Sequence, residues 1–111
     1  MPKGSEQLTN ARKEEIINAC AKLYTTMNFK DITLKQISLE TTFTRTSIYN
    51  YFQTKEEIFL ALFQREYDLW TTDIRQIFEK YEVMTVDEFA SALAHTLEKR
   101  ECLLKLLSIN H

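Results

Sequence analysis

The sequence predicts an all-α protein. Its only Pro is Pro2 and its only Gly is Gly4, so the rest of the chain lacks the two residues that most strongly interrupt helices. Capping boxes, in which a Thr precedes a Glu or Gln by three residues, begin at Thr33, Thr54 and Thr85. Apolar residues recur at helical spacing before and after these positions. These features predict a chain of helices without strands.

Composition indicates a folded protein. With 44% hydrophobic and 27% charged residues among 111, the chain can bury a core without disulfides or metal. It has no apolar run of about 20 residues that could span a membrane, and no signal-peptide pattern. We therefore expect a cytoplasmic protein. Cys20 and Cys102 lie within apolar helical patterns and are interpreted as reduced core residues rather than a disulfide.

Charge is distributed unevenly. Residues 1–55 contain 8 Lys or Arg and 5 Asp or Glu, a balance of +3, whereas residues 56–111 contain 6 and 11, a balance of −5. No acidic residue occurs between Thr41 and Lys55. A surface without negative charge is one that a polyanion can approach, so the first half is the candidate nucleic-acid surface.

The first half reads as a flexible tail (1–8) and a three-helix domain (9–55). The first helix runs from about Thr9 to Asn28, where Asn could adopt the left-handed conformation that ends helices. A short second helix begins at Thr33, and a turn follows near Thr42. The second and third helices form a predicted helix-turn-helix motif at about 33–52.

The third predicted helix begins at Thr44. At 100° per residue, Ile48 and Phe52 lie on one side of it, and Thr46, Ser47 and Asn50 lie on the other. One side can therefore dock into a core while the other offers hydrogen-bonding groups.

Residues 56–111 read as a long connecting helix and part of a second helical domain. The long helix ends at about Lys80, and another helix runs from Val86 to about Lys99 with Phe89, Ala90, Leu93, Ala94 and Leu97 inward. The segment from Cys102 to Ile109 has more apolar surface than this chain can cover, which suggests a truncated chain or a dimer interface. The aromatic residues of this half could line an effector pocket, although core packing is favoured for them: Phe63, Trp70, Phe78 and Tyr81.

From about Asn10 to Ile58 the chain resembles the DNA-binding domain of the tetracycline-repressor (TetR) family. The segment TSIYNYFQTKEE matches the family's aromatic-rich recognition helix and the Lys-Glu start of its next helix. The resemblance implies a transcriptional regulator, usually a repressor, that binds a pseudo-palindromic operator as a homodimer. A small-molecule effector in the C-terminal domain would release it from the DNA.

The resemblance also implies which residues contact double-stranded DNA. Thr33 and Lys35 would contact phosphates, Thr44, Arg45, Thr46 and Ser47 would enter the major groove, and Tyr49, Tyr51 and Lys55 would hold the backbone. Independently, short hydroxyl side chains at a helix start allow close approach to a phosphate, which the helix dipole also favours. Arg45 can make a bidentate contact with a guanine edge, worth about 1–3 kcal/mol of discrimination. Each of these residues could instead have a role without DNA: Arg45 could be a solvated surface charge, both tyrosines could pack in the core, and Lys55 could merely follow the N-cap of the next helix.

The chain departs from the family pattern in two places. Thr42 stands where the family usually has Gly; a left-handed conformation there would cost roughly 1–2 kcal/mol, unless the turn takes another shape. Family members also carry further helices, which would lie beyond His111.

Other function classes have less support. The sequence contains no Gly-rich phosphate loop and no Gly-flanked nucleophile, so we expect neither an enzyme nor a cofactor. His95 lacks further ligands at metal-binding spacing. The competing hypothesis is a helical adaptor that recognises protein through its acidic second half.

Overall fold

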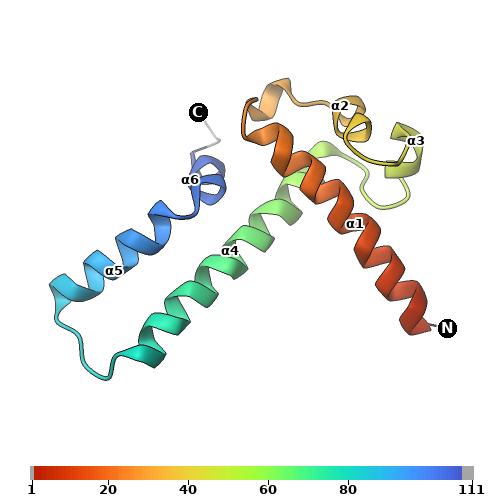
Figure 1. Ribbon diagram of the computed structural model, residues 1–111. Helices are drawn as coiled ribbons and strands as arrows, with labels where there is room; N and C mark the ends of the chain where they lie inside the picture. Colours follow the sequence, from red (N-terminus) through yellow and green to blue (C-terminus); the bar gives the residue numbers. More distant parts are fainter. Residues whose placement is uncertain (1, 109–111) are drawn as a thin grey trace. The chain divides into compact units, whose positions relative to one another are not determined.

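The computed structural model describes residues 2–108, and within them every regular element is a helix (Figure 1). The predicted all-α fold is confirmed. The elements are α1 (Pro2–Tyr24), the 3₁₀ helix η1 (Phe29–Asp31), α2 (Leu34–Leu39), α3 (Arg45–Ile48), α4 (Lys55–Lys80), α5 (Val86–Glu98) and α6 (Glu101–Leu107). The chain forms two compact units that divide between Leu62 and Phe63, inside α4.

Helix α1 begins earlier than the sequence suggested. The start was predicted at Thr9, but the helix begins at Pro2, so residues 2–8 of the predicted tail are helical. Proline suits the first turn of a helix because its missing N–H would have no partner there and its φ is already helical. Side chains 5–11 are exposed, so burial does not account for the extension. Asn28, suggested as a left-handed helix end, instead has extended backbone with φ −89° and ψ 158° before η1.

The first unit is built around an aliphatic core. Helix α1 packs against α2, and α2 against α3. The ring of Phe59 makes edge-to-face contacts with Tyr24 and Phe29, with centroids 5.1 and 4.7 Å apart. The buried residues of this unit include Ile16, Cys20, Ile32, Ile37, Ile48, Phe52, Ile58 and Leu62. The core extends past the predicted domain end at Lys55 because the first turns of α4 contribute Ile58, Phe59 and Leu62.

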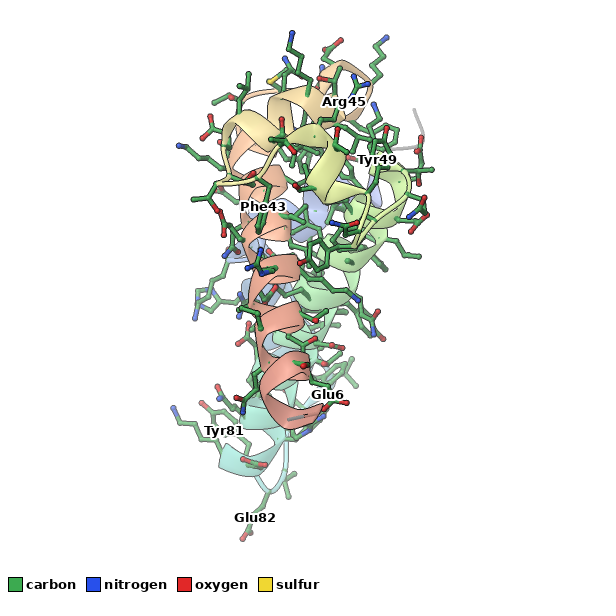
Figure 2. The ribbon with its side chains drawn as sticks, turned by 90° about the vertical axis from the view of Figure 1, so that its right-hand side faces the viewer. Glu6, Phe43, Arg45, Tyr49, Tyr81 and Glu82 are labelled. Carbon is green, nitrogen blue, oxygen red and sulfur yellow. The ribbon has the colours of Figure 1, made fainter. Side chains whose placement is uncertain are left out.

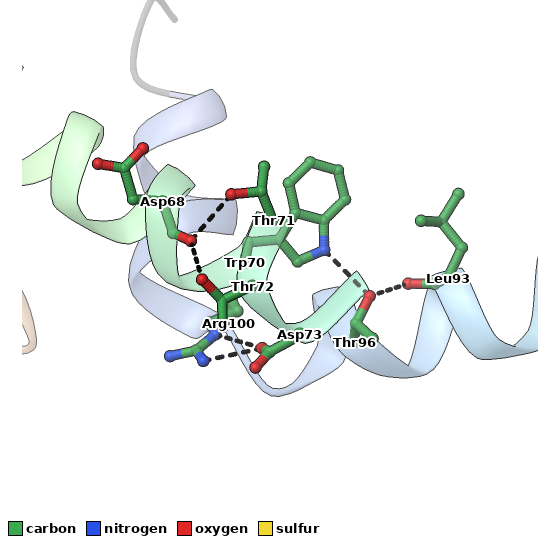
Figure 3. A network of polar contacts seen from close by, with 8 residues as sticks. All are labelled: Asp68, Trp70, Thr71, Thr72, Asp73, Leu93, Thr96 and Arg100. Carbon is green, nitrogen blue, oxygen red and sulfur yellow. Dashed lines mark hydrogen bonds and ion pairs between the residues drawn. The ribbon is translucent and has the colours of Figure 1, made fainter. Parts of the chain in front are cut away.

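Polar contacts tie the helices of the second unit together (Figure 3). Trp70 of α4 donates its indole N–H to the hydroxyl of buried Thr96 on α5, at 3.0 Å. Arg100 forms an ion pair with Asp73 of α4, in which Nη2 lies 2.8 Å from Oδ2. Of the four aromatic residues for which core packing was favoured, Phe63 and Trp70 are half-buried, whereas Phe78 and Tyr81 are exposed.

The apolar face of α5 differs from the prediction. Phe89, Ala90 and Ala94 were expected to point inward, but all three are exposed. Leu93 and Leu97 are half-buried, and Leu103 and Leu106 of α6 are buried. Helical spacing identifies an apolar face but does not say whether another element covers it.

Neither cysteine forms a disulfide: Cys20 is buried and Cys102 is half-buried. Burial, followed by the charge of Glu66, raises the pKa of Cys102 from 9.0 to about 11. Because the folded state disfavours the ionised thiol, Cys102 stabilises the folded protein fully only at pH values below the pKa that the thiol has in the unfolded chain. That contribution is lost as pH rises from 9.0 toward about 11.

This pKa predicts a slow thiol. In a Cys20→Ala variant, folded Cys102 should react with a thiol reagent at about pH 8 roughly a hundredfold more slowly than in the unfolded chain, because thiolate is the reactive form. The release of a chromogenic leaving group measures the rate. Equal rates in the folded and unfolded chain would contradict the raised pKa.

Candidate nucleic-acid interface

The start of α2 is fixed by the predicted capping box. Thr33 Oγ1 accepts a hydrogen bond from the Gln36 backbone N–H at 3.2 Å, and Gln36 Oε1 accepts from the Thr33 N–H at 2.9 Å. Ile32 and Ile37 on either side are fully buried. Lys35, the second residue of the helix, is exposed. The cap therefore holds Thr33 and Lys35 on the outer surface of the motif.

The turn between α2 and α3 does not use a left-handed residue. No described non-glycine residue has positive φ, so Thr42 avoids the conformation that would have required Gly. Hydroxyl groups satisfy the backbone instead, since Thr41 Oγ1 donates to the Ser38 carbonyl at 2.8 Å and accepts from the Phe43 N–H at 3.1 Å. Of the two alternatives for this position, a turn of another shape is the one observed.

Helix α3 has a solvent side and a core side, but it ends at Ile48, before Asn50 and Phe52, and Ser47, which was predicted on the outer side, is half-buried. Thr44 is its N-cap and accepts from the Ser47 N–H at 3.1 Å. Ile48 is fully buried and Phe52, beyond the helix, is 7% exposed. Arg45 and Thr46 are exposed. With only four residues, α3 has a small macrodipole, so any phosphate binding here depends on side chains more than on the helix dipole expected from the sequence.

The two tyrosines after α3 have different surroundings. Tyr49 is 40% exposed, and Figure 2 shows it with Arg45 on the α3 part of the motif. Tyr51 is half-buried, and its ring lies 6.1 Å from that of Phe43. Tyr49 is therefore the more accessible of the two for a ligand.

Lys55 is held by the domain itself. Its ammonium group donates to the carbonyls of Phe29 at 2.7 Å and Ile32 at 2.9 Å, and it lies 4.3 Å from the centroid of the Phe29 ring. These contacts fasten the start of α4 to the segment between α1 and α2. Lys55 therefore has a structural role in the fold, and its direct contact with a phosphate remains a prediction.

Replacing Lys55 with Met should lower the free energy of unfolding by roughly 1–3 kcal/mol, because two carbonyls lose a charged donor while the aliphatic stem is kept. Urea titration followed by circular dichroism measures the change. The control is Lys30→Met on exposed η1, which should change stability by less than about 0.5 kcal/mol. Equal stability of both variants would mean that the Lys55 contacts contribute nothing to folding.

Side chains from α1 complete this region, and sequence reasoning missed them. Glu15 accepts two hydrogen bonds from Thr42, and Lys22 forms an ion pair of 2.9 Å with Glu40 at the end of α2. Both carboxylates near the turn thus have partners from another element. No local spacing signal links residues this far apart in sequence.

The short helices α2 and α3, joined by a tight turn and with α2 packed on α1, form a helix-turn-helix module, the class of domain by which many transcriptional regulators bind DNA. Residues 16–62 match the family model "Bacterial regulatory proteins, tetR family", and residues 64–111 match "Tetracyclin repressor-like, C-terminal domain". The chain belongs to the TetR family. Comparison with curated proteins and with solved structures gave no match. Within residues 2–108, none of the helices combines the length and the hydrophobicity that a membrane span requires.

Proposed function

We propose that this chain is a cytoplasmic transcriptional repressor that binds a pseudo-palindromic operator as a homodimer. Each protomer would place α3 in the major groove. The contacts would come from Thr33 and Lys35 at the start of α2, Thr44, Arg45, Thr46 and Ser47 at the start of α3, Tyr49 and Tyr51 after it, and Lys55 at the start of α4. A small-molecule effector bound in the C-terminal unit would release the DNA.

The observation that carries this proposal is the placement of Arg45. It is exposed on the first turn of α3, one turn from Ile48, which is fully buried. The burial of Ile48 fixes the rotation of the helix, so the Arg45 guanidinium is presented outward by a rigid element. A guanidinium held in this way can form the two parallel hydrogen bonds that recognise guanine in the major groove.

The second unit supports the dimer and the effector. It exposes apolar side chains on α4, α5, α6 and the connection between α4 and α5, namely Leu69, Phe78, Val83, Val86, Phe89, Leu104 and Leu107. Exposed apolar surface of this kind is typical of protein interfaces. Phe78, Tyr81, Met84 and Phe89 also line a shallow groove, a setting in which an apolar effector could bind.

Selection of duplexes from a random-sequence pool tests the proposal. The chain should enrich inverted repeats whose half-site centres lie about 34–36 Å apart, or a multiple of that spacing, because two α3 helices must reach one face of the DNA. Enrichment of single half-sites would contradict the dimer. A chain that retains no DNA even at low salt would favour the adaptor, since phosphate attraction alone should persist there.

A further inference from the structure

The turn between α2 and α3 is held from outside the motif by α1. Glu15 Oε2 accepts hydrogen bonds from the backbone N–H of Thr42 at 2.7 Å and from its hydroxyl at 2.9 Å. These residues are 27 apart in sequence. One carboxylate oxygen therefore binds both donors of the residue that replaces the usual glycine.

A second α1 side chain contacts the next residue of the turn. The Arg12 guanidinium lies 5.6 Å from the centroid of the Phe43 ring, within the range of a cation–π contact. Arg12 and Glu15 are three residues apart and so share one face of α1. Figure 2 shows Phe43 beside α1, with Glu6 far from it toward the start of the same helix. We call Arg12, Glu15, Thr42 and Phe43 the α1 clamp.

The α1 clamp ends where the proposed reading helix begins. Thr44, the N-cap of α3, directly follows Phe43, and Arg45 is the first residue of the helix. On the far side of Arg45 the first buried residue is Ile48. The start of α3 thus has two supports: Ile48 from the core, and the α1 clamp through Thr42 and Phe43.

We propose that Glu15 is a positioning residue for DNA recognition, which fixes the start of α3 so that Arg45 meets the base edges in one orientation. This inference rests on the proposed function. Thr42 is exposed, so water can replace Glu15 as its acceptor. Loss of Glu15 should therefore make the turn between α2 and α3 less ordered while lowering the free energy of unfolding only slightly. Its effect should appear in specific DNA binding, because bidentate recognition depends on geometry.

Charge and positioning act in opposite directions here, which makes the proposal testable. Glu15 is an anion near the proposed DNA surface, so its removal should strengthen attraction to phosphates in general. If Glu15 matters only through its charge, Glu15→Ala will bind all DNA more tightly. If it positions α3, the same variant will bind its selected duplex more weakly and random duplex no more weakly than wild type.

Amide hydrogen exchange, measured by NMR on the full chain, tests the α1 clamp without DNA. Glu15→Ala should speed exchange at the Thr42 N–H by roughly tenfold, because a charged acceptor is lost. Glu15→Gln keeps an acceptor without charge and should lie between this variant and wild type. Glu6→Ala removes a charge from an exposed position of the same helix and is the matched control. Unchanged exchange at Thr42 in Glu15→Ala would overturn the inference.

Fluorescence anisotropy with the selected duplex and a random duplex tests the consequence. We expect Glu15→Ala to lose roughly tenfold in affinity for the selected duplex, with partial recovery in Glu15→Gln and no loss in Glu6→Ala. Equal affinity of Glu15→Ala and wild type for the selected duplex would overturn the positioning role alone. If wild type selects no duplex, the proposed function fails and this role with it, whereas the exchange result reports on the α1 clamp separately.

Discussion

Ile48→Ala should lower the free energy of unfolding of the first unit by about 2–5 kcal/mol, because it leaves a cavity where a fully buried side chain stood. Ile48 is the only buried residue within α3, so the helix also loses its attachment to the core. Denaturant titration followed by circular dichroism measures the loss. DNA binding should fall with it on specific and random duplexes alike.

Leu39→Ala provides the matched control for Ile48. Leu39 lies at the end of α2 in the same motif but is 75% exposed. Its truncation should change stability by less than about 0.5 kcal/mol. A loss at Leu39 as large as that at Ile48 would show that burial does not decide stability in this motif.

Arg45→Ala should weaken binding to a selected operator by roughly 5- to 150-fold, the equivalent of the 1–3 kcal/mol carried by a bidentate contact with guanine. Binding to random duplex should fall much less, because one cation among several is lost there. Titrations of both duplexes by fluorescence anisotropy measure the two affinities. The ratio of the affinity for the selected operator to the affinity for random duplex should therefore fall.

The control for Arg45 is Arg75→Ala, which removes an exposed Arg from α4 in the second unit. It should leave both affinities unchanged. If Arg45→Ala weakens both duplexes equally, Arg45 contacts phosphate and does not read bases.

Local signals predicted the elements of this fold well. The boxes at Thr33 and Thr85 form in full in the structure. At Thr54 the box is shifted, since Thr54 Oγ1 accepts from the Glu57 N–H at 3.2 Å while Glu57 Oε1 accepts from the Gln53 N–H at 3.3 Å. Such bonds join residues three or four apart, so their partners can be read from the chain directly.

Contacts across long sequence separations could not be predicted. Lys55 looks like a free cation after a cap, yet it binds carbonyls 26 and 23 residues earlier. Glu15 looks like one of several acids on a solvated helix face, yet it holds Thr42. The backbone groups that Lys55 and Glu15 bind cannot be recognised in the sequence, because nearly every residue has a backbone N–H and C=O.

In the candidate site, too, local features could be predicted from the sequence, whereas contacts between distant segments could not. The sides of α3 followed from 100° per residue, so the burial of Ile48 and the exposure of Thr46 were both expected. The burial of α5 was not predictable, since Ala90 and Ala94 have helical spacing but remain exposed. Coverage of an apolar face depends on what else packs there, which periodicity does not encode.

The most direct test of DNA recognition by this surface is an anisotropy titration against random duplex at two salt concentrations. It compares wild type with a Lys35→Ala/Tyr49→Ala variant, which removes two exposed groups of the proposed surface. We predict binding that weakens with salt and is weaker in the variant, because both residues would contact the backbone. Binding that is undetectable at low salt, or identical in the variant, would contradict the proposed interface.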